Sequence, residues 1–115
     1  MLLVIDVGNT QTVVGLYDSG DRSHELVDHW RLATHAERTS DELALTVRHL
    51  LQTRGLDLAT DVQGVSVSSG VPSVTYELRQ MCERYLEVDP VIVGTGVRTG
   101  MPVLYENPRE VGPDR

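Results

Sequence analysis

Apolar runs separated by turn residues fill the first third of the chain, a pattern typical of β-strands. Residues 2–5 form an unbroken apolar run that stops at Asp6, as in a strand buried on both faces. Residues 12–17 are rich in β-branched side chains and predict a second strand, and the Gly8–Asn9 turn signal indicates that the two strands form a hairpin. Residues 25–32 alternate between apolar and polar positions and predict a third strand.

Helical periodicity begins after this segment. Thr39 followed by Glu42 is a capping box, and Gly55 ends the apolar stripe that follows it. Ser73 is predicted to cap a second helix. The two stripes consist of Leu43, Val47, Leu50 and Leu51, and of Val74, Leu78, Met81, Cys82 and Tyr85.

Two more strands are predicted around the second helix, over residues 62–67 and 90–93. Residues 94–115, interrupted by Gly and Pro, are predicted to be mostly loop. The resulting order is β-β-β-α-β-α-β. It indicates an α/β protein whose mixed sheet has three antiparallel strands followed by a strand–helix–strand unit.

Composition and charge exclude or disfavour several classes of protein. The chain has 115 residues, which suits one domain, and its net charge is −7. Nucleic-acid binding is disfavoured because it depends on clustered cations. All basic residues are arginine, which excludes a P-loop ATPase that needs its lysine. One cysteine and an apolar N-terminal run too short for a leader or a membrane span favour a cytoplasmic protein without membrane attachment.

The segment Asp6-Val7-Gly8-Asn9-Thr10 carries the most chemical information. A carboxylate leaves a buried strand, and a glycine turn then exposes backbone N–H groups beside a hydroxyl. Such a turn can hold phosphate oxygens, while the carboxylate holds Mg²⁺ directly or through water. The alternative, a plain hairpin turn with a surface Asp, is equally compatible with the spacing.

The second informative segment covers residues 105–115. Its Gly, Asp and Arg residues offer close backbone approach, a base and a cation at one point. A solvated charged tail explains the same residues more simply when they are taken alone. We interpret the four histidines as surface residues, Cys82 as a core residue, and Trp30 as a core or interface residue.

Three segments in register resemble the N-terminal half of a type III pantothenate kinase. They are Asp6-Val7-Gly8-Asn9-Thr10, then Gly96-Val97-Arg98-Thr99-Gly100-Met101-Pro102, then Asn107-Pro108-Arg109-Glu110-Val111-Gly112-Pro113-Asp114-Arg115. The resemblance covers essentially the whole chain. It implies the acetate-and-sugar-kinase/actin superfamily and a ribonuclease-H-like, actin-like ATPase domain.

The resemblance also implies a role for individual residues. The first phosphate loop for ATP would consist of Asp6, Val7, Gly8, Asn9, Thr10, Gln11, Thr12 and Val13, with Asp6 near the metal. Tyr105 would line the pantothenate pocket. Gly112, Pro113, Asp114 and Arg115 would bind substrate, with Asp114 as the catalytic proton acceptor. Pro113 replaces the family's usual alanine and removes one backbone N–H.

The activity implied is ATP-dependent phosphorylation of pantothenate to 4′-phosphopantothenate, the first step of coenzyme A biosynthesis, with Mg²⁺ and a monovalent cation (K⁺ or NH₄⁺). A homodimer is implied as well. Residues 1–115 would form an incomplete N-terminal domain. The second ATPase domain and the cation's carboxylate ligand lie outside them, so the chain alone is expected to be inactive. The alternative is a non-catalytic accessory or transcription-regulatory protein of the same fold family.

Overall fold

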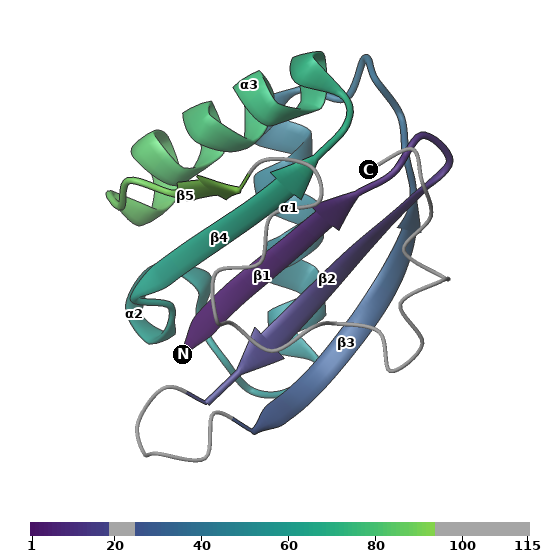
Figure 1. Ribbon diagram of the computed structural model, residues 1–115. Helices are drawn as coiled ribbons and strands as arrows, with labels where there is room; N and C mark the ends of the chain where they lie inside the picture. The colour runs from purple at the N-terminus through teal and green to yellow at the C-terminus, as the bar shows by residue number, and fades with distance from the viewer. Residues whose placement is uncertain (19–24, 94–115) are drawn as a thin grey trace.

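A five-stranded sheet organises the chain, whose computed structural model describes residues 1–18 and 25–93 (Figure 1). Its strand order is β3-β2-β1-β4-β5. β1 pairs antiparallel with β2 and parallel with β4, β2 pairs antiparallel with β3, and β4 pairs parallel with β5. The elements are β1 (Leu2–Val7), β2 (Gln11–Tyr17), β3 (Leu26–Ala33), α1 (Ser40–Gln52), α2 (Leu58–Asp61), β4 (Gly64–Ser69), α3 (Pro72–Met81), the π-helix η1 (Cys82–Leu86) and β5 (Val91–Val93). The predicted α/β class, a mixed sheet of three antiparallel strands followed by a strand–helix–strand unit, is confirmed.

The hydrophobic core lies between one face of this sheet and the helices α1 and α3. Leu3, Ile5 and Val7 of β1 point to that face and are at most 1% exposed. They belong to one buried cluster together with Val47 of α1 and Leu78 of α3. Because side chains alternate along a strand, Asp6 points to the opposite face.

Helix α1 forms where the capping box predicts it. The Thr39 hydroxyl accepts a hydrogen bond from Glu42 N (3.2 Å), and the Glu42 carboxylate accepts one from Thr39 N (2.9 Å). Gly55 then adopts φ +72° beyond the last turn. With 13 residues, α1 is the longest described helix. Across residues 1–18 and 25–93, no helix has the length and apolar character needed to cross a membrane.

The predicted start of α3 at Ser73 is wrong. Val71 is the N-cap residue and Pro72 occupies the first turn. Proline is preorganised for a first helical position and needs no hydrogen-bond acceptor there, so the helix begins before Ser73. The Ser69 hydroxyl instead accepts a hydrogen bond from Val71 N, at 3.0 Å.

The sequence patterns do not predict two short elements, α2 and η1. In α2, the Asp57 carboxylate caps the helix by accepting from Ala59 N at 2.7 Å. This helix occupies the chain just before the fourth strand, which spans Gly64–Ser69 rather than residues 62–67. The element η1 continues α3 with a wider, π-helical turn. Its Tyr85 Oη donates a hydrogen bond to Asp41 Oδ1 of α1 at 2.5 Å.

The end of η1 yields a stability prediction. Glu87 adopts a left-handed conformation, with φ 56° and ψ 38°. This conformation costs a side-chain-bearing residue about 1–2 kcal/mol. We expect Glu87→Gly to raise the free energy of unfolding by about 1 kcal/mol in chemical denaturation. Gly55→Ala, the matched control at the end of α1, should lower it by a similar amount. No change in either variant would contradict the conformational account.

Cys82 yields a second prediction. Its thiol is fully buried, and its pKa is raised to about 11, first by burial and then by the negative charge of Asp89. The thiolate is the reactive form, and roughly one thiol in a thousand is ionised at pH 8 with such a pKa. Iodoacetamide at pH 8 should therefore leave Cys82 unmodified in the folded chain and alkylate it in urea. Equal labelling rates in both conditions would show that Cys82 is accessible.

Candidate functional site

The carboxyl ends of β1, β3 and β4 meet at one edge of the sheet (Figure 1). Three connections therefore lie together there: the β1–β2 turn, the β3–α1 connection and the β4–α3 connection. In open α/β sheets, ligands bind beyond the carboxyl ends of parallel strands. This edge is consequently the candidate site, and it contains the turn that the sequence singled out.

Hydrogen bonds hold the β1–β2 turn from both sides. On one side, Thr34 N donates to Thr10 O at 2.9 Å, and the hydroxyls of Thr12 and Thr34 are 2.8 Å apart. On the other side, Gly70 N donates to Val7 O at 3.2 Å. The turn is thus positioned by the residues that follow β3 and β4.

Gly8 makes the turn narrow. Its N–H donates to Gln11 O at 2.9 Å, so this N–H closes the hairpin. A Cβ atom at Gly8 would lie 3.2 Å from the same carbonyl oxygen, closer than ordinary packing. Asn9 and Thr10, in contrast, form the exposed part of the turn.

Asp6 is not a surface residue. It is 6% exposed, and its neighbours across the sheet are Val13 of β2 and Ser68 of β4. These three residues share the face opposite the helices, as their register and the alternation of side chains require. The structure thus contradicts the alternative of a plain turn with a surface Asp, because a carboxylate is buried next to the site edge.

The remaining predicted phosphate-loop residues divide between the two faces. Val7 and Thr12 pair across β1 and β2 on the helix side, whereas Val13 lies on the Asp6 side. Val7 and Val13 are at most 1% exposed, so their side chains serve packing. Gln11 is exposed at the start of β2.

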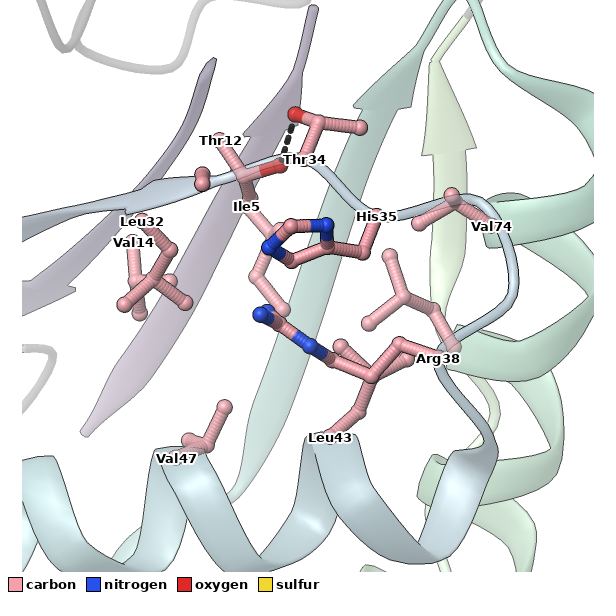
Figure 2. A pocket seen from close by; sticks show the side chains of 12 residues that line it. Ile5, Thr12, Val14, Leu32, Thr34, His35, Arg38, Leu43, Val47 and Val74 are labelled. Atoms are coloured by element: carbon pink, nitrogen blue, oxygen red, sulfur yellow. Dashed lines mark hydrogen bonds between the residues drawn. The ribbon is translucent and has the colours of Figure 1, made fainter. Parts of the chain in front are cut away.

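On the helix side, a pocket opens beside the turn (Figure 2). Thr12, Thr34, His35 and Arg38 supply its polar groups, and apolar residues of the sheet, α1 and α3 form the rest. Its volume of about 20 Å³ has room for roughly one water molecule. Sequence reasoning missed Arg38, whose only signal is its position directly before the helix cap Thr39.

The other sequence hypotheses have mixed outcomes. His29, His35 and His49 are exposed, as predicted for surface histidines, and His24 lies outside the described residues. Cys82 is in the core. Trp30 is partly buried and packs against the core cluster. The substrate-site residues predicted at Tyr105, Gly112, Pro113, Asp114 and Arg115 also lie outside the described residues, so their roles stay predictions.

Comparison with known proteins gives these features a family. Residues 2–115 match the family model described as type III pantothenate kinase. The chain is 50% identical over 115 residues to a type III pantothenate kinase of Halalkalibacterium halodurans and 52% identical to one of Myxococcus xanthus. In each case it is covered completely and spans 43% of the relative's length.

A solved structure matches the fold. The Fowlpox virus resolvase, crystallised with Holliday junction DNA, superposes with a TM-score of 0.55 at 11% identity, covering 96% of this chain and 70% of the resolvase. At that identity the likeness concerns the fold alone. The family match extends over nearly the whole sequence and includes the Asp6–Thr10 segment at the site edge, and the chain therefore belongs to the type III pantothenate kinase family.

Proposed function

We propose that the whole protein transfers the γ-phosphoryl group of ATP to the primary hydroxyl of pantothenate and releases 4′-phosphopantothenate and ADP. The observation that carries this proposal is the buried carboxylate of Asp6 beside a turn that hydrogen bonds fix at the carboxyl edge of the sheet. Residues 1–115 would supply the N-terminal domain of a two-domain ATPase. ATP would lie between this domain and a second one.

The described half of the site suits phosphate and Mg²⁺. Exposed Asn9 and Thr10 can offer backbone N–H groups to phosphate oxygens. Mg²⁺ is usually bound through one or two carboxylates together with substrate phosphates. Among the described residues there is no cluster of three or more His, Cys, Asp or Glu side chains that could hold a metal alone. One buried carboxylate, Asp6, next to the Ser68 position fits this mode, and the ion would neutralise phosphate charge there.

The rest of the proposed site comes from the family resemblance. Asp114 accepts the proton of the pantothenate hydroxyl. The hydroxyl oxygen attacks the γ-phosphorus at the same time, and the bond between the γ-phosphorus and the ADP oxygen breaks. Arg115 binds an anionic group of a substrate, Gly112 and Pro113 shape the backbone beside it, and Tyr105 lines the pantothenate pocket. Phosphoryl transfer depends mainly on such positioning and charge neutralisation. A homodimer, a monovalent cation (K⁺ or NH₄⁺) and a cytoplasmic location complete the proposal.

A chimera tests this function. These 115 residues would replace the matching 43% of the Halalkalibacterium relative, and pantothenate-dependent ADP release would be measured. We expect an active chimera, and Asp114→Asn should lower kcat by about 10²- to 10⁴-fold because the proton acceptor is lost. Asp89→Asn, which changes an exposed carboxylate, is the matched control and should leave kcat unchanged.

Two outcomes of this experiment would count against the proposal. An inactive chimera with a native circular dichroism spectrum would contradict the kinase function. An Asp114→Asn chimera within a few-fold of the parent would contradict only the role of Asp114. The 115-residue chain alone should release no ADP, and turnover by that chain would disprove the two-domain arrangement.

The Gly8 turn generates a separate prediction for the same chimera. An added Cβ at Gly8 meets a backbone oxygen at 3.2 Å, so Gly8→Ala must shift the turn. We expect the KM for ATP to rise about tenfold, equivalent to about 1.4 kcal/mol of binding. In Gly64→Ala, the new Cβ meets the Leu2 Cδ1 atom at 3.4 Å, an ordinary contact, and the KM should not change. Equal KM values for both variants would remove the turn from ATP binding.

A further inference from the structure

The pocket on the helix face carries a feature that the proposed kinase reaction does not use. His35 and Arg38 both come from the β3–α1 connection and reach into the pocket (Figure 2). The backbone N–H of Arg38 donates to the backbone carbonyl oxygen of His35 at 3.1 Å, which closes this connection into a tight turn. Two nitrogen-rich side chains therefore share one pocket in a chain of net charge −7.

Within the part of the chain that the structure describes, no carboxylate forms an ion pair with Arg38, and its charge acts only on Glu42, as the last of the causes that shift the Glu42 pKa. The Arg38 side chain is half-buried, and its guanidinium makes no hydrogen bond or ion pair with any residue of 1–18 or 25–93. Partial burial of a charge is costly unless another group compensates it. Arg54 and Arg84 differ in this respect, since Arg54 Nε lies 3.9 Å from Asp28 Oδ2 and Arg84 Nη1 lies 3.1 Å from Asp41 Oδ1.

The nearby carboxylate of Glu42 already has other partners. It accepts hydrogen bonds from Thr39 N at 2.9 Å and from the Thr39 hydroxyl at 3.2 Å. These bonds are the main cause that lowers the Glu42 pKa, and the charge of Arg38 contributes least. Glu42 is therefore engaged in capping α1, and the guanidinium is left to face the pocket.

The geometry points to an oxyanion-binding site at the rim of this pocket, formed by Arg38 and His35. The ligand class is a small anion with two or more oxygens, either a phosphate group or a carboxylate, because a guanidinium pairs with both through parallel hydrogen bonds. The pocket volume of about 20 Å³ excludes a larger body from the interior, so the anion lies at the rim. Asp6 points to the other face of the sheet, which keeps this site apart from the proposed metal position.

The site is connected to the phosphate turn. Thr34 lies directly before His35 in the chain. Its backbone N–H donates to the Thr10 carbonyl oxygen, and its hydroxyl forms a hydrogen bond with the Thr12 hydroxyl. An anion at the rim is therefore expected to affect the Thr34 amide as well as the two side chains.

Nuclear magnetic resonance titration of the 115-residue chain tests the site. Sodium phosphate, sodium acetate and sodium chloride would be added at constant ionic strength, while the Arg38 Nε–H, the His35 ring and the Thr34 amide are followed. We expect saturable shifts with phosphate or acetate and none with chloride. Tighter binding of phosphate would assign the site to a phosphate group, and tighter binding of acetate would assign it to a carboxylate.

Variants decide whether Arg38 binds the anion. Arg38→Gln should weaken binding by at least about tenfold, and Arg38→Lys should restore part of it because the charge returns without the planar fork. His35→Gln, at an exposed position, should also weaken binding. Arg48→Gln, on the exposed surface of α1, is the matched control and should bind as the parent does. Thermal unfolding of each variant would confirm that it is folded.

The site would be disproved by shifts that do not saturate, by equal shifts with chloride, or by unchanged binding in Arg38→Gln and His35→Gln. None of these results depends on ADP release by the chimera. The oxyanion site and the kinase function can therefore fail separately.

Discussion

The hydrogen bonding of β1 on both of its edges determines where the rest of the molecule lies. β1 pairs antiparallel with β2 along six positions and parallel with β4 along six positions. The antiparallel pairing requires a tight turn after Val7, and the parallel pairing brings the end of β4 beside that turn. The short contacts of Thr34 and Gly70 with the turn follow from this arrangement, because both residues come directly after strands that end at the same edge.

The register of this pairing also separates two kinds of chemistry. Asp6 lies opposite Val13 and Ser68, whereas Thr12 lies opposite Val7. A shift of one residue would exchange the faces and bring the carboxylate into the apolar layer under α1 and α3. The Gly8–Gln11 hydrogen bond fixes the turn length that sets this register. A carboxylate on one face and a cationic pocket on the other therefore share a single turn.

Much of this fold could be predicted from local sequence. The capping box of Thr39 and Glu42, the glycine beyond α1 and the apolar runs of β1 and β2 are determined by neighbouring residues, and the structure confirms each of them. The N-cap predicted at Ser73 is wrong. Serine favours N-cap positions in general, but Pro72 suits the first turn of α3, and Val71 is the N-cap residue. The π-helix η1 has no periodic signal, because its widened turn depends on packing and on the contact between Tyr85 and Asp41.

The site was harder to predict because it depends on residues that are distant in the sequence. The motif from Asp6 to Thr10 identified the turn, but not that Gly8 uses its N–H internally or that Asp6 is buried. Arg38 gave no motif signal at all. Its proximity to the turn arises only because β3 ends next to β2 and the Thr12 and Thr34 hydroxyls meet.

The charge of the chain makes such local contacts decisive. With a net charge of −7, these 115 residues do not attract anions over long distances, and salt screens charges beyond about 8 Å under physiological conditions. Recognition of phosphate or carboxylate must then come from groups in contact with them. The chain contains no lysine, so its permanent side-chain cations are all guanidinium groups, whose planar donors bind oxyanions in a defined orientation. The placement of each arginine relative to the β1–β2 turn therefore affects which anions this edge can hold and how they are oriented.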